Sequence, residues 1–236
     1  MKTLGIIGGI GPESTVEYYR TIISLYRQQL RDGSYPPLLI NSIDLKREIE
    51  MVERHDRAGL TLFIAEEVER LARAGAHIAL IASNTPHIVF DEVAQRSTLP
   101  LLSIVETASA EAKRRGLKRA ALFGTRFTMM GSFYPKVFSR EGIELIIPDS
   151  EDREFVHDKY MNELVQGTFL PETRSELLHI VERMADEKGA DSVLLAGTEL
   201  PLILKDETHR GIPLIDTMRI HAAAAVAEML TPSDME

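Results

Sequence analysis

Three short segments place hydroxyl, amide and ionisable side chains directly after apolar runs. They are Ser83-Asn84-Thr85-Pro86-His87, Gly124-Thr125-Arg126-Phe127-Thr128 and Gly197-Thr198-Glu199-Leu200-Pro201. The side chains that could donate to a bound carboxylate are those of Asn84, Thr85, Thr125, Thr128 and Thr198. Hydrogen bonds to a charged acceptor are about twice as strong as neutral ones, so such a set suits a carboxylate. Each segment alone could equally be a helix cap, but three together favour a shared site.

A glycine-rich turn near the N-terminus, Gly8-Gly9-Ile10-Gly11-Pro12, could bring backbone amides to an anion. It has neither the spacing of a dinucleotide fingerprint nor the lysine of a P-loop. The helix expected from Ser14 would still favour a negative charge at its N-terminus, which makes the amides of Gly9 and Ile10 candidate ligand donors. A tight strand-to-helix turn with Ser14 or Thr15 as N-cap explains the same residues.

The elements that carry these segments follow an α/β pattern, because short apolar runs alternate with longer amphipathic stretches. Strands are expected at residues 4–7, 38–40, 78–82, 101–105, 120–123, 145–147, 192–195 and 214–215. Helices are expected at residues 14–31, 57–74, 107–115, 131–140, 154–166, 173–188 and 218–230. Ligands of open parallel sheets bind beyond the carboxyl ends of the strands, where all three segments lie.

An internal repeat divides the chain into two similar lobes. Residues 74–85 align with residues 188–199, so that Ser83 corresponds to Gly197. We expect residues 1–98 with 210–236 to form one lobe and residues 99–209 the other, each a mostly parallel sheet flanked by helices. A ligand cleft is expected between them. The alternative is that any two Gly-Ala-strand units resemble each other.

Composition narrows the functional classes. The net charge of -9 argues against binding to a phosphate backbone, so nucleic acid is not an expected partner. No apolar run reaches the roughly 20 residues that span a bilayer, and the N-terminus lacks a signal-peptide layout; we therefore expect no membrane association and a cytoplasmic location. The chain has no cysteine, which excludes disulfides, thiolate metal ligands and thiol nucleophiles.

The motifs together resemble the aspartate/glutamate racemase family, in particular its aspartate racemase and broad-specificity amino-acid racemase branches. The resemblance rests on Gly-Gly-Ile-Gly-Pro, Asn84-Thr85-x-His87, Gly-Thr-x-x-Thr at 124–128 and Thr198-Glu199, and it runs from about Lys2 to Leu230. It implies two pseudo-symmetric α/β lobes with an amino acid or dicarboxylate bound between them. It also implies chemistry without pyridoxal phosphate, other cofactors or metal, and we expect a homodimer.

The two catalytic cysteines of that family align with Ser83 and Gly197, so neither position keeps a thiol. A thiol can be tuned to titrate near neutral pH, whereas a serine hydroxyl without an adjacent base cannot serve. Glu199 and His87 are the main replacement bases, with Glu13 and Asp44 as further candidates. Each has an ordinary alternative: Glu199 as a hydrogen-bond partner, His87 in packing, Glu13 at a helix N-terminus and Asp44 in solvent. Gly197 is expected to leave room for a side chain beside Thr198.

Two functional classes remain. One is a cofactor-independent isomerase that keeps the racemase pocket and uses a non-thiol base. The other is a catalytically silent relative that binds a small carboxylate as a sensor or buffer. Removal of the cysteines by engineering is a third interpretation of the same sequence.

Overall fold

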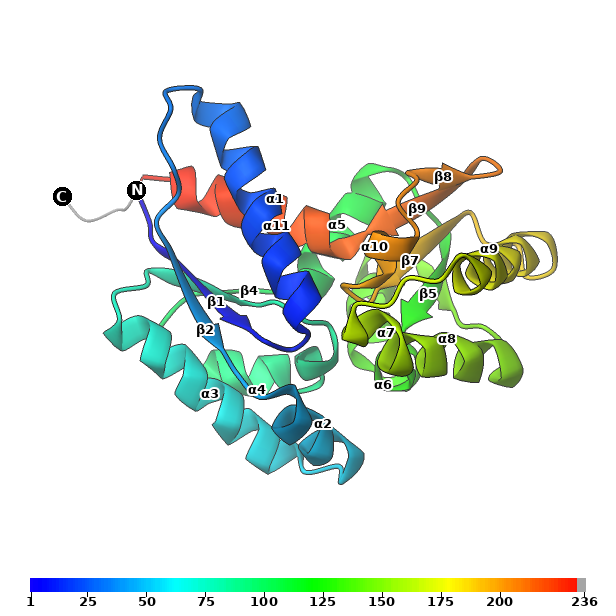
Figure 1. Ribbon diagram of the computed structural model, residues 1–236, viewed down its shortest axis with the longest axis horizontal. Helices are drawn as coiled ribbons and strands as arrows, with labels where there is room; N and C mark the ends of the chain where they lie inside the picture. The colour runs from blue at the N-terminus through cyan, green and yellow to red at the C-terminus, as the bar shows by residue number, and fades with distance from the viewer. Residues whose placement is uncertain (233–236) are drawn as a thin grey trace. The chain divides into compact units, whose positions relative to one another are not determined.

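Strands and helices alternate along the chain in the computed structural model, which describes residues 1–232 (Figure 1). The chain divides into two units. Among the described residues, the first comprises Met1–Ile104 and residues 219–232, and the second comprises Val105–Met218. Each contains its own sheet, so the α/β class and the mostly parallel sheets expected from the sequence are confirmed.

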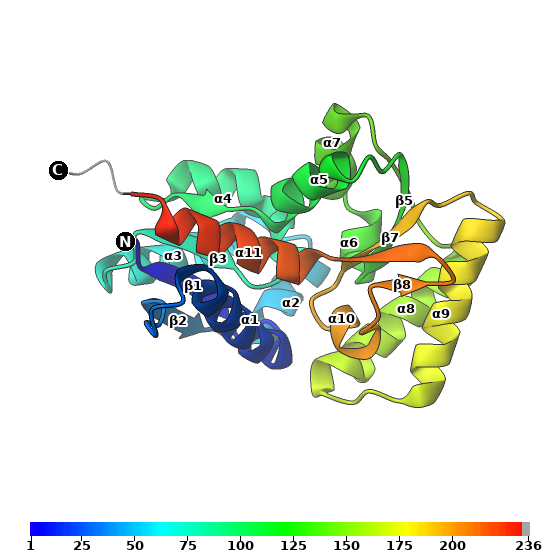
Figure 2. The same ribbon diagram turned by 90° about the horizontal axis from the view of Figure 1, so that it is seen from above.

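The first unit is built on a parallel sheet with the strand order β2-β1-β3-β4. Its strands are β1 (Leu4–Gly8), β2 (Leu38–Ser42), β3 (Ile78–Ile81) and β4 (Leu101–Leu102). Its helices are α1 (Pro12–Leu30), α2 (Leu45–Glu53), α3 (Arg57–Arg73), the 3₁₀ helix η1 (Thr85–Val89), α4 (Phe90–Arg96) and most of α11 (Thr217–Leu230). Figures 1 and 2 show α1 and α11 on one face of this sheet and α3 and α4 on the other.

Covering both faces with helices explains the composition of the central strands. Leu4, Ile6 and Ile7 of β1 are fully buried, and each residue of β3 is at most 1% exposed. Strands buried on both faces are continuous apolar runs rather than alternating ones, which is the pattern the sequence shows here.

The second unit contains the strand order β6-β5-β7-β9-β8, in which only the β8–β9 pair is antiparallel. Its strands are β5 (Arg119–Gly124), β6 (Glu144–Ile146), β7 (Ser192–Ala196), β8 (Thr208–His209) and β9 (Ile212–Asp216). Its helices are α5 (Ile104–Arg114), α6 (Arg126–Met130), α7 (Phe133–Phe138), η2 (Ser139–Glu141), α8 (Ser150–Asn162), η3 (Leu164–Gln166), α9 (Pro171–Asp186) and α10 (Leu200–Ile203). Figure 2 shows α8 and α9 on one side of β5 and β7, and α5 and α7 on the other.

Alternate residues of the central strands supply the core beneath α8 and α9. Phe123 of β5 and Leu195 of β7 join one apolar cluster with Val156 and Tyr160 of α8 and with buried residues of α9. The neighbouring strand residues, such as Leu122 and Leu194, are equally buried but lie outside this cluster. Side chains of a strand alternate between faces, so these residues belong to the opposite face.

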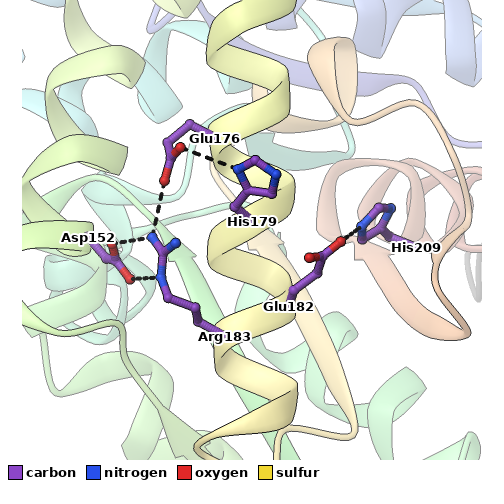
Figure 3. Close-up of polar contacts among 6 residues, drawn as sticks. All are labelled: Asp152, Glu176, His179, Glu182, Arg183 and His209. Carbon is purple, nitrogen blue, oxygen red and sulfur yellow. Dashed lines mark hydrogen bonds and ion pairs between the residues drawn. The ribbon is translucent and has the colours of Figure 1, made fainter.

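Charged contacts join α9 to the elements beside it (Figure 3). Arg183 of α9 forms a two-pronged ion pair with Asp152 of α8, with nitrogen–oxygen distances of 2.6 and 3.1 Å, and also contacts Glu176 at 3.2 Å. Glu182, on the same helix, lies 2.7 Å from His209 of β8. The contact of Glu182 with His209 attaches the short antiparallel strand to the helix layer.

The unit boundaries lie later in the chain than the sequence analysis places them. Strand β9 pairs with β7 and β8 pairs with β9, so residues 210–218 belong to the second unit and not to the first. Strand β4 pairs with β3, which assigns residues 99–104 to the first unit. Strand pairing, which the repeat alone does not reveal, decides both boundaries.

The expected strands and helices are all present, with shifted ends. Residues 103–105 were expected to continue a strand, but α5 begins at Ile104. Residues 41–56 lie outside the expected strands and helices, but α2 begins at Leu45, with the Asp44 carboxylate accepting from the Lys46 amide at 2.9 Å. Within the described residues, none of the helices is both long and apolar enough to cross a bilayer.

Candidate active site

The segment after β3 is buried and held by an imidazole. Ser83, Asn84 and Thr85 are each less than 10% exposed. The His87 ring stacks on Phe90, with centroids 4.9 Å apart, and its Nε2 accepts from the Ile104 amide at 3.2 Å. Burial, followed by the nearby His221, lowers the pKa of His87 to about 3. A neutral ring whose Nε2 lone pair is engaged favours the packing role of His87 over the role of base.

The glycine-rich turn after β1 is a tight structural turn. A Cβ on Gly8 would lie 2.4 Å from Thr15 Cγ2, and one on Gly9 would lie 2.4 Å from the Ile43 carbonyl oxygen. Gly9 also has a φ of 84°, a conformation that favours glycine. Its amide donates to Thr15 Oγ1 at 2.9 Å, so this donor is engaged within the turn. Ile10 is 1% exposed.

The start of α1 corrects the expected cap. The helix begins at Pro12 with Gly11 as N-cap, rather than at Ser14 with a hydroxyl cap. The hydroxyls of Ser14 and Thr15 instead donate to the Gly11 carbonyl at 2.9 and 3.0 Å. Proline is favoured at the first helical position because it lacks the N–H that would have no partner there. Glu13 lies exposed in the first turn, as a favourable partner of the helix dipole would.

Glu48 is a buried carboxyl that the sequence analysis does not identify. It lies in the first turn of α2 and is 1% exposed. Burial raises its pKa to about 8. Among residues 1–232 its Oε1 has no hydrogen-bond partner. The only sequence signal is its position four residues before the buried Val52 on one helix face.

In the second unit, the Gly124–Thr128 segment forms a helix cap. The Thr125 hydroxyl accepts from the Thr128 amide at 3.2 Å and lies 3.2 Å from the Thr128 hydroxyl. A Cβ on Gly124 would lie 2.5 Å from the Ala196 carbonyl oxygen, so only glycine allows β5 and β7 to approach this closely at their ends. The two hydroxyls are therefore brought together beside the end of β7.

The segment after β7 contains a buried carboxyl with two hydroxyl donors. Tyr160 of α8 donates its hydroxyl proton to Glu199 Oε2, and Thr198 donates to the same oxygen at 3.0 Å. Glu199 is fully buried, and Tyr160 is 6% exposed. Burial and the adjacent Glu199 hold the pKa of the Tyr160 phenol well above its usual range. The phenol is thus a proton donor to Glu199 at all physiological pH values.

Tyr160 also fills the space beside Gly197. A Cβ built on Gly197 would lie 2.4 Å from the Tyr160 ring carbon Cε2 and 3.1 Å from two further ring carbons. The expectation that Gly197 leaves room for a side chain is therefore wrong. Tyr160 is not recognisable as a site residue from the sequence, because it belongs to the i, i+4, i+8 series of Val156, Tyr160 and Leu164, which is typical of a core-facing helix stripe.

Each unit thus assembles part of the expected site. The first unit holds Ser83, Asn84, Thr85 and His87 in one segment after β3. The second unit brings Gly197, Thr198 and Glu199 together with Tyr160, and it pairs Thr125 with Thr128. A binding site that uses both sets stays a prediction.

Comparison with known proteins extends over the whole chain. The Asp/Glu/Hydantoin racemase family model matches residues 7–225. The broad specificity amino-acid racemase RacX of Bacillus subtilis is 27% identical over 233 residues, which cover 96% of this chain and 98% of the relative. A candidate Asp/Glu racemase from Yersinia pestis has 30% identity and a TM-score of 0.86, over 98% of this chain and all of its own. An aspartate racemase homologue from Pyrococcus horikoshii has 31% identity and a TM-score of 0.81, over the same shares.

Proposed function

The chain belongs to the Asp/Glu/Hydantoin racemase family, and from that premise we propose that it is a cofactor-independent, amino-acid racemase-like protein with a non-thiol site. Its proposed ligand is a small amino acid or dicarboxylate. The support is the family match together with the full-length similarity to a Bacillus subtilis relative that is named as a broad specificity amino-acid racemase.

The donor set suits the α-carboxylate of such a ligand. Asn84 and Thr85 follow β3, Thr125 and Thr128 follow β5, and Thr198 follows β7. Each lies at the carboxyl end of a parallel strand, the edge at which open α/β sheets bind ligands. In the proposed complex Asn84, Thr85, Thr125, Thr128 and neighbouring amides, among them those after β7, hold the carboxylate, while the Thr198 hydroxyl donates to Glu199.

Glu199 is the proposed base. Its carboxylate takes the proton from the ligand's α-carbon, and the electron pair of that C–H bond moves into the adjacent carboxylate as an enediolate. The resulting carboxylic acid, after exchange with water, returns a proton to the same carbon. The observation that carries this assignment is the contact of Glu199 with Tyr160 beside Gly197, where the family's second thiol would lie.

A single base has a defined stereochemical consequence. Return of the proton from the same side exchanges the α-hydrogen without inverting the carbon. Inversion then requires a proton from the other side, for which the aligned Ser83 hydroxyl is a poor donor without a base beside it. Exchange is therefore expected to be faster than interconversion of the D and L forms.

The test is exchange of the α-proton for solvent deuterium across a panel of D- and L-amino acids, including aspartate and glutamate, followed by NMR. Wild type should incorporate deuterium, and Glu199→Gln should lower the rate by at least about 100-fold, the usual scale of general-base catalysis. Glu151→Gln, on exposed α8 surface of the same unit, is the matched control and should exchange like wild type. Exchange that survives in Glu199→Gln would remove Glu199 as the base.

The alternative candidate is a silent carboxylate-binding protein, which the loss of both thiols favours. Calorimetric titration with the same panel separates the two: binding without exchange would support the silent relative and exclude the enzyme. We further propose that the protein works in the cytoplasm as a homodimer. Analytical ultracentrifugation should then give a mass of about twice the 26.4 kDa chain.

A further inference from the structure

We infer that Tyr160 is the positioning residue of this site: its ring takes the place of the side chain missing at position 197, and its hydroxyl holds the Glu199 carboxylate for reaction. This inference rests on the proposed function. It assigns a role to a residue of α8 that lies 37 positions before Gly197 in the chain. Three properties of the residue support it, namely space, hydrogen bonding and charge.

Space, and not backbone conformation, explains the glycine at position 197. Gly197 is absent from the glycines of this chain with positive φ, so an L-residue could adopt its backbone. What prevents a side chain is the Tyr160 ring, whose Cε2 would lie 2.4 Å from a Cβ. Real Cβ atoms are not found this close to ring carbons. The ring and the glycine are therefore complementary, and the ring occupies the volume in which a thiol would otherwise project.

The Tyr160 hydroxyl and the Thr198 hydroxyl converge on one oxygen of Glu199. Both donate to Oε2, one from helix α8 and the other from the end of β7. Two donors from separate elements fix the rotation of the carboxyl group. Because Glu199 is fully buried, donors that favour its ionised form are also what allow it to carry a charge.

The charge states agree with this arrangement. Burial and the adjacent carboxylate raise the pKa of the Tyr160 phenol and keep it protonated, so its hydroxyl can donate to Glu199. A purely structural tyrosine would also need a partner for its hydroxyl when buried. The two roles differ in one measurable respect, because only a positioning role makes the rate of α-proton exchange depend on the Tyr160 hydroxyl.

Tyr160→Phe tests the inference while keeping the ring. Loss of one donor should raise the pKa of Glu199, so the acid limb of the deuterium-exchange profile should move to higher pH by about one unit or more. The maximal rate should fall about tenfold or more, with little change in KM. Tyr134→Phe is the matched control: Tyr134 is a fully buried tyrosine of the same unit whose hydroxyl bonds to Thr217. Its profile should match that of wild type.

A readout that needs no turnover separates this inference from the proposed function. With carboxyl-¹³C glutamate incorporated, the Glu199 resonance is identified by its loss in Glu199→Gln and titrated by NMR. Tyr160→Phe should raise its pKa, and Thr198→Val, which removes the other donor, should do the same. If neither variant moves the titration, the inference is overturned, whatever the exchange rates are. If the titration moves but wild type exchanges no amino acid, the proposed enzyme fails while the coupling of Tyr160 to Glu199 stands.

Discussion

At the scale of single residues, the pair Gly197 and Tyr160 constrains what the second unit can tolerate. The ring lies in the apolar cluster beneath α8 and α9, so it has little freedom to move aside. Overpacking such a site typically costs about 1–3 kcal/mol, because neighbouring side chains are forced from their preferred rotamers. This has a direct consequence for variants at position 197.

Gly197→Ala should therefore destabilise the protein by about 1–3 kcal/mol in urea unfolding. In the double variant Gly197→Ala with Tyr160→Ala the clash is absent. Its loss of unfolding free energy should therefore be smaller than the sum of the two single-variant losses by about 0.5–3 kcal/mol. Tyr134→Ala in place of Tyr160→Ala is the control and should give additive costs. Additivity in both pairs would contradict the packing described here.

Sequence position predicted where the candidate site residues lie along the strands better than it predicted which residues surround them. Asn84, Thr85 and Thr198 could be assigned to strand ends from their positions after apolar runs, and the structure places them there. Tyr160 and Glu48 could not be assigned. Tyr160 has the spacing of an ordinary core aromatic on a helix, and Glu48 resembles the other charged residues of a short polar helix. Their significance depends on contacts between elements, which periodicity does not contain.

At the scale of elements, the His221 side chain joins three parts of the first unit. Located on α11, it accepts from the Tyr18 hydroxyl of α1 at 2.9 Å through Nδ1. Its Nε2 donates to the Leu102 carbonyl of β4 at 3.0 Å. Burial lowers the pKa of this imidazole to about 4, so the ring is neutral and carries its proton on Nε2. One side chain thereby satisfies a buried donor and a buried acceptor on different elements.

His221→Leu should cost about 2–6 kcal/mol of unfolding free energy at pH 7, because it leaves the Tyr18 hydroxyl and the Leu102 carbonyl without this partner and each loss costs about 1–3 kcal/mol. Urea unfolding measures the loss. His179→Leu, at an exposed position of α9, is the control and should change stability by less than about 0.5 kcal/mol. A His221→Leu protein as stable as the control would show that the bonds contribute nothing.

Long runs of helix-forming residues that end at glycines or polar last turns identified the long helices, and the short elements that were missed have no such runs. Helices α1, α3, α9 and α11 lie close to their expected ranges. Helix α2 is nine residues long, and its N-cap Asp44 is a residue type equally common in loops. Strand β8 has two residues and exists because it pairs with β9. No local sequence pattern predicts this pairing.

At the scale of the whole molecule, three buried titratable groups of the first unit contribute to the pH dependence of stability between pH 3 and pH 8. The pKa values of His87 and His221 are lowered to about 3 and about 4 from 6.5. The stability that these two histidines contribute is fully present above pH 6.5. It is lost as the pH falls from 6.5 toward their folded-state pKa values, because the unfolded chain then binds more protons than the folded one. The pKa of Glu48 is raised from 4.5 to about 8. Its contribution is complete below pH 4.5 and is lost as the pH rises through 8.

Wild type should therefore be most stable near pH 6.5, with stability falling on both sides. Glu48→Gln keeps the shape of the carboxyl but cannot ionise, so the alkaline fall should be reduced while the acid fall remains. The advantage of the variant over wild type should grow between pH 5 and pH 9, reaching several kcal/mol at about 1.4 kcal/mol per pKa unit. Thermal unfolding across this range measures it, with Glu53→Gln on the exposed surface of the same helix as control. A constant difference between Glu48→Gln and wild type would contradict the assignment.

The repeat between residues 74–85 and 188–199 predicted two α/β lobes, and the two sheets confirm them. It could not give the route of the chain between them. That route depends on which strands pair at the sheet edges, and β9 joins the second sheet before α11 returns to the first unit.

This return has a consequence for synthesis on the ribosome. The second unit is complete in sequence at Met218, whereas the first still lacks α11. Helix α11 buries Ala222, Val226 and Met229, and the Met229 carbonyl accepts from the Lys2 amide at 3.1 Å. The first unit therefore starts to emerge before the second but is completed after it. While the second unit is translated, one face of the first unit's sheet lacks α11. Nascent chains that stall before Arg219 would expose that apolar face, which makes them natural clients for chaperones that recognise uncovered apolar surface.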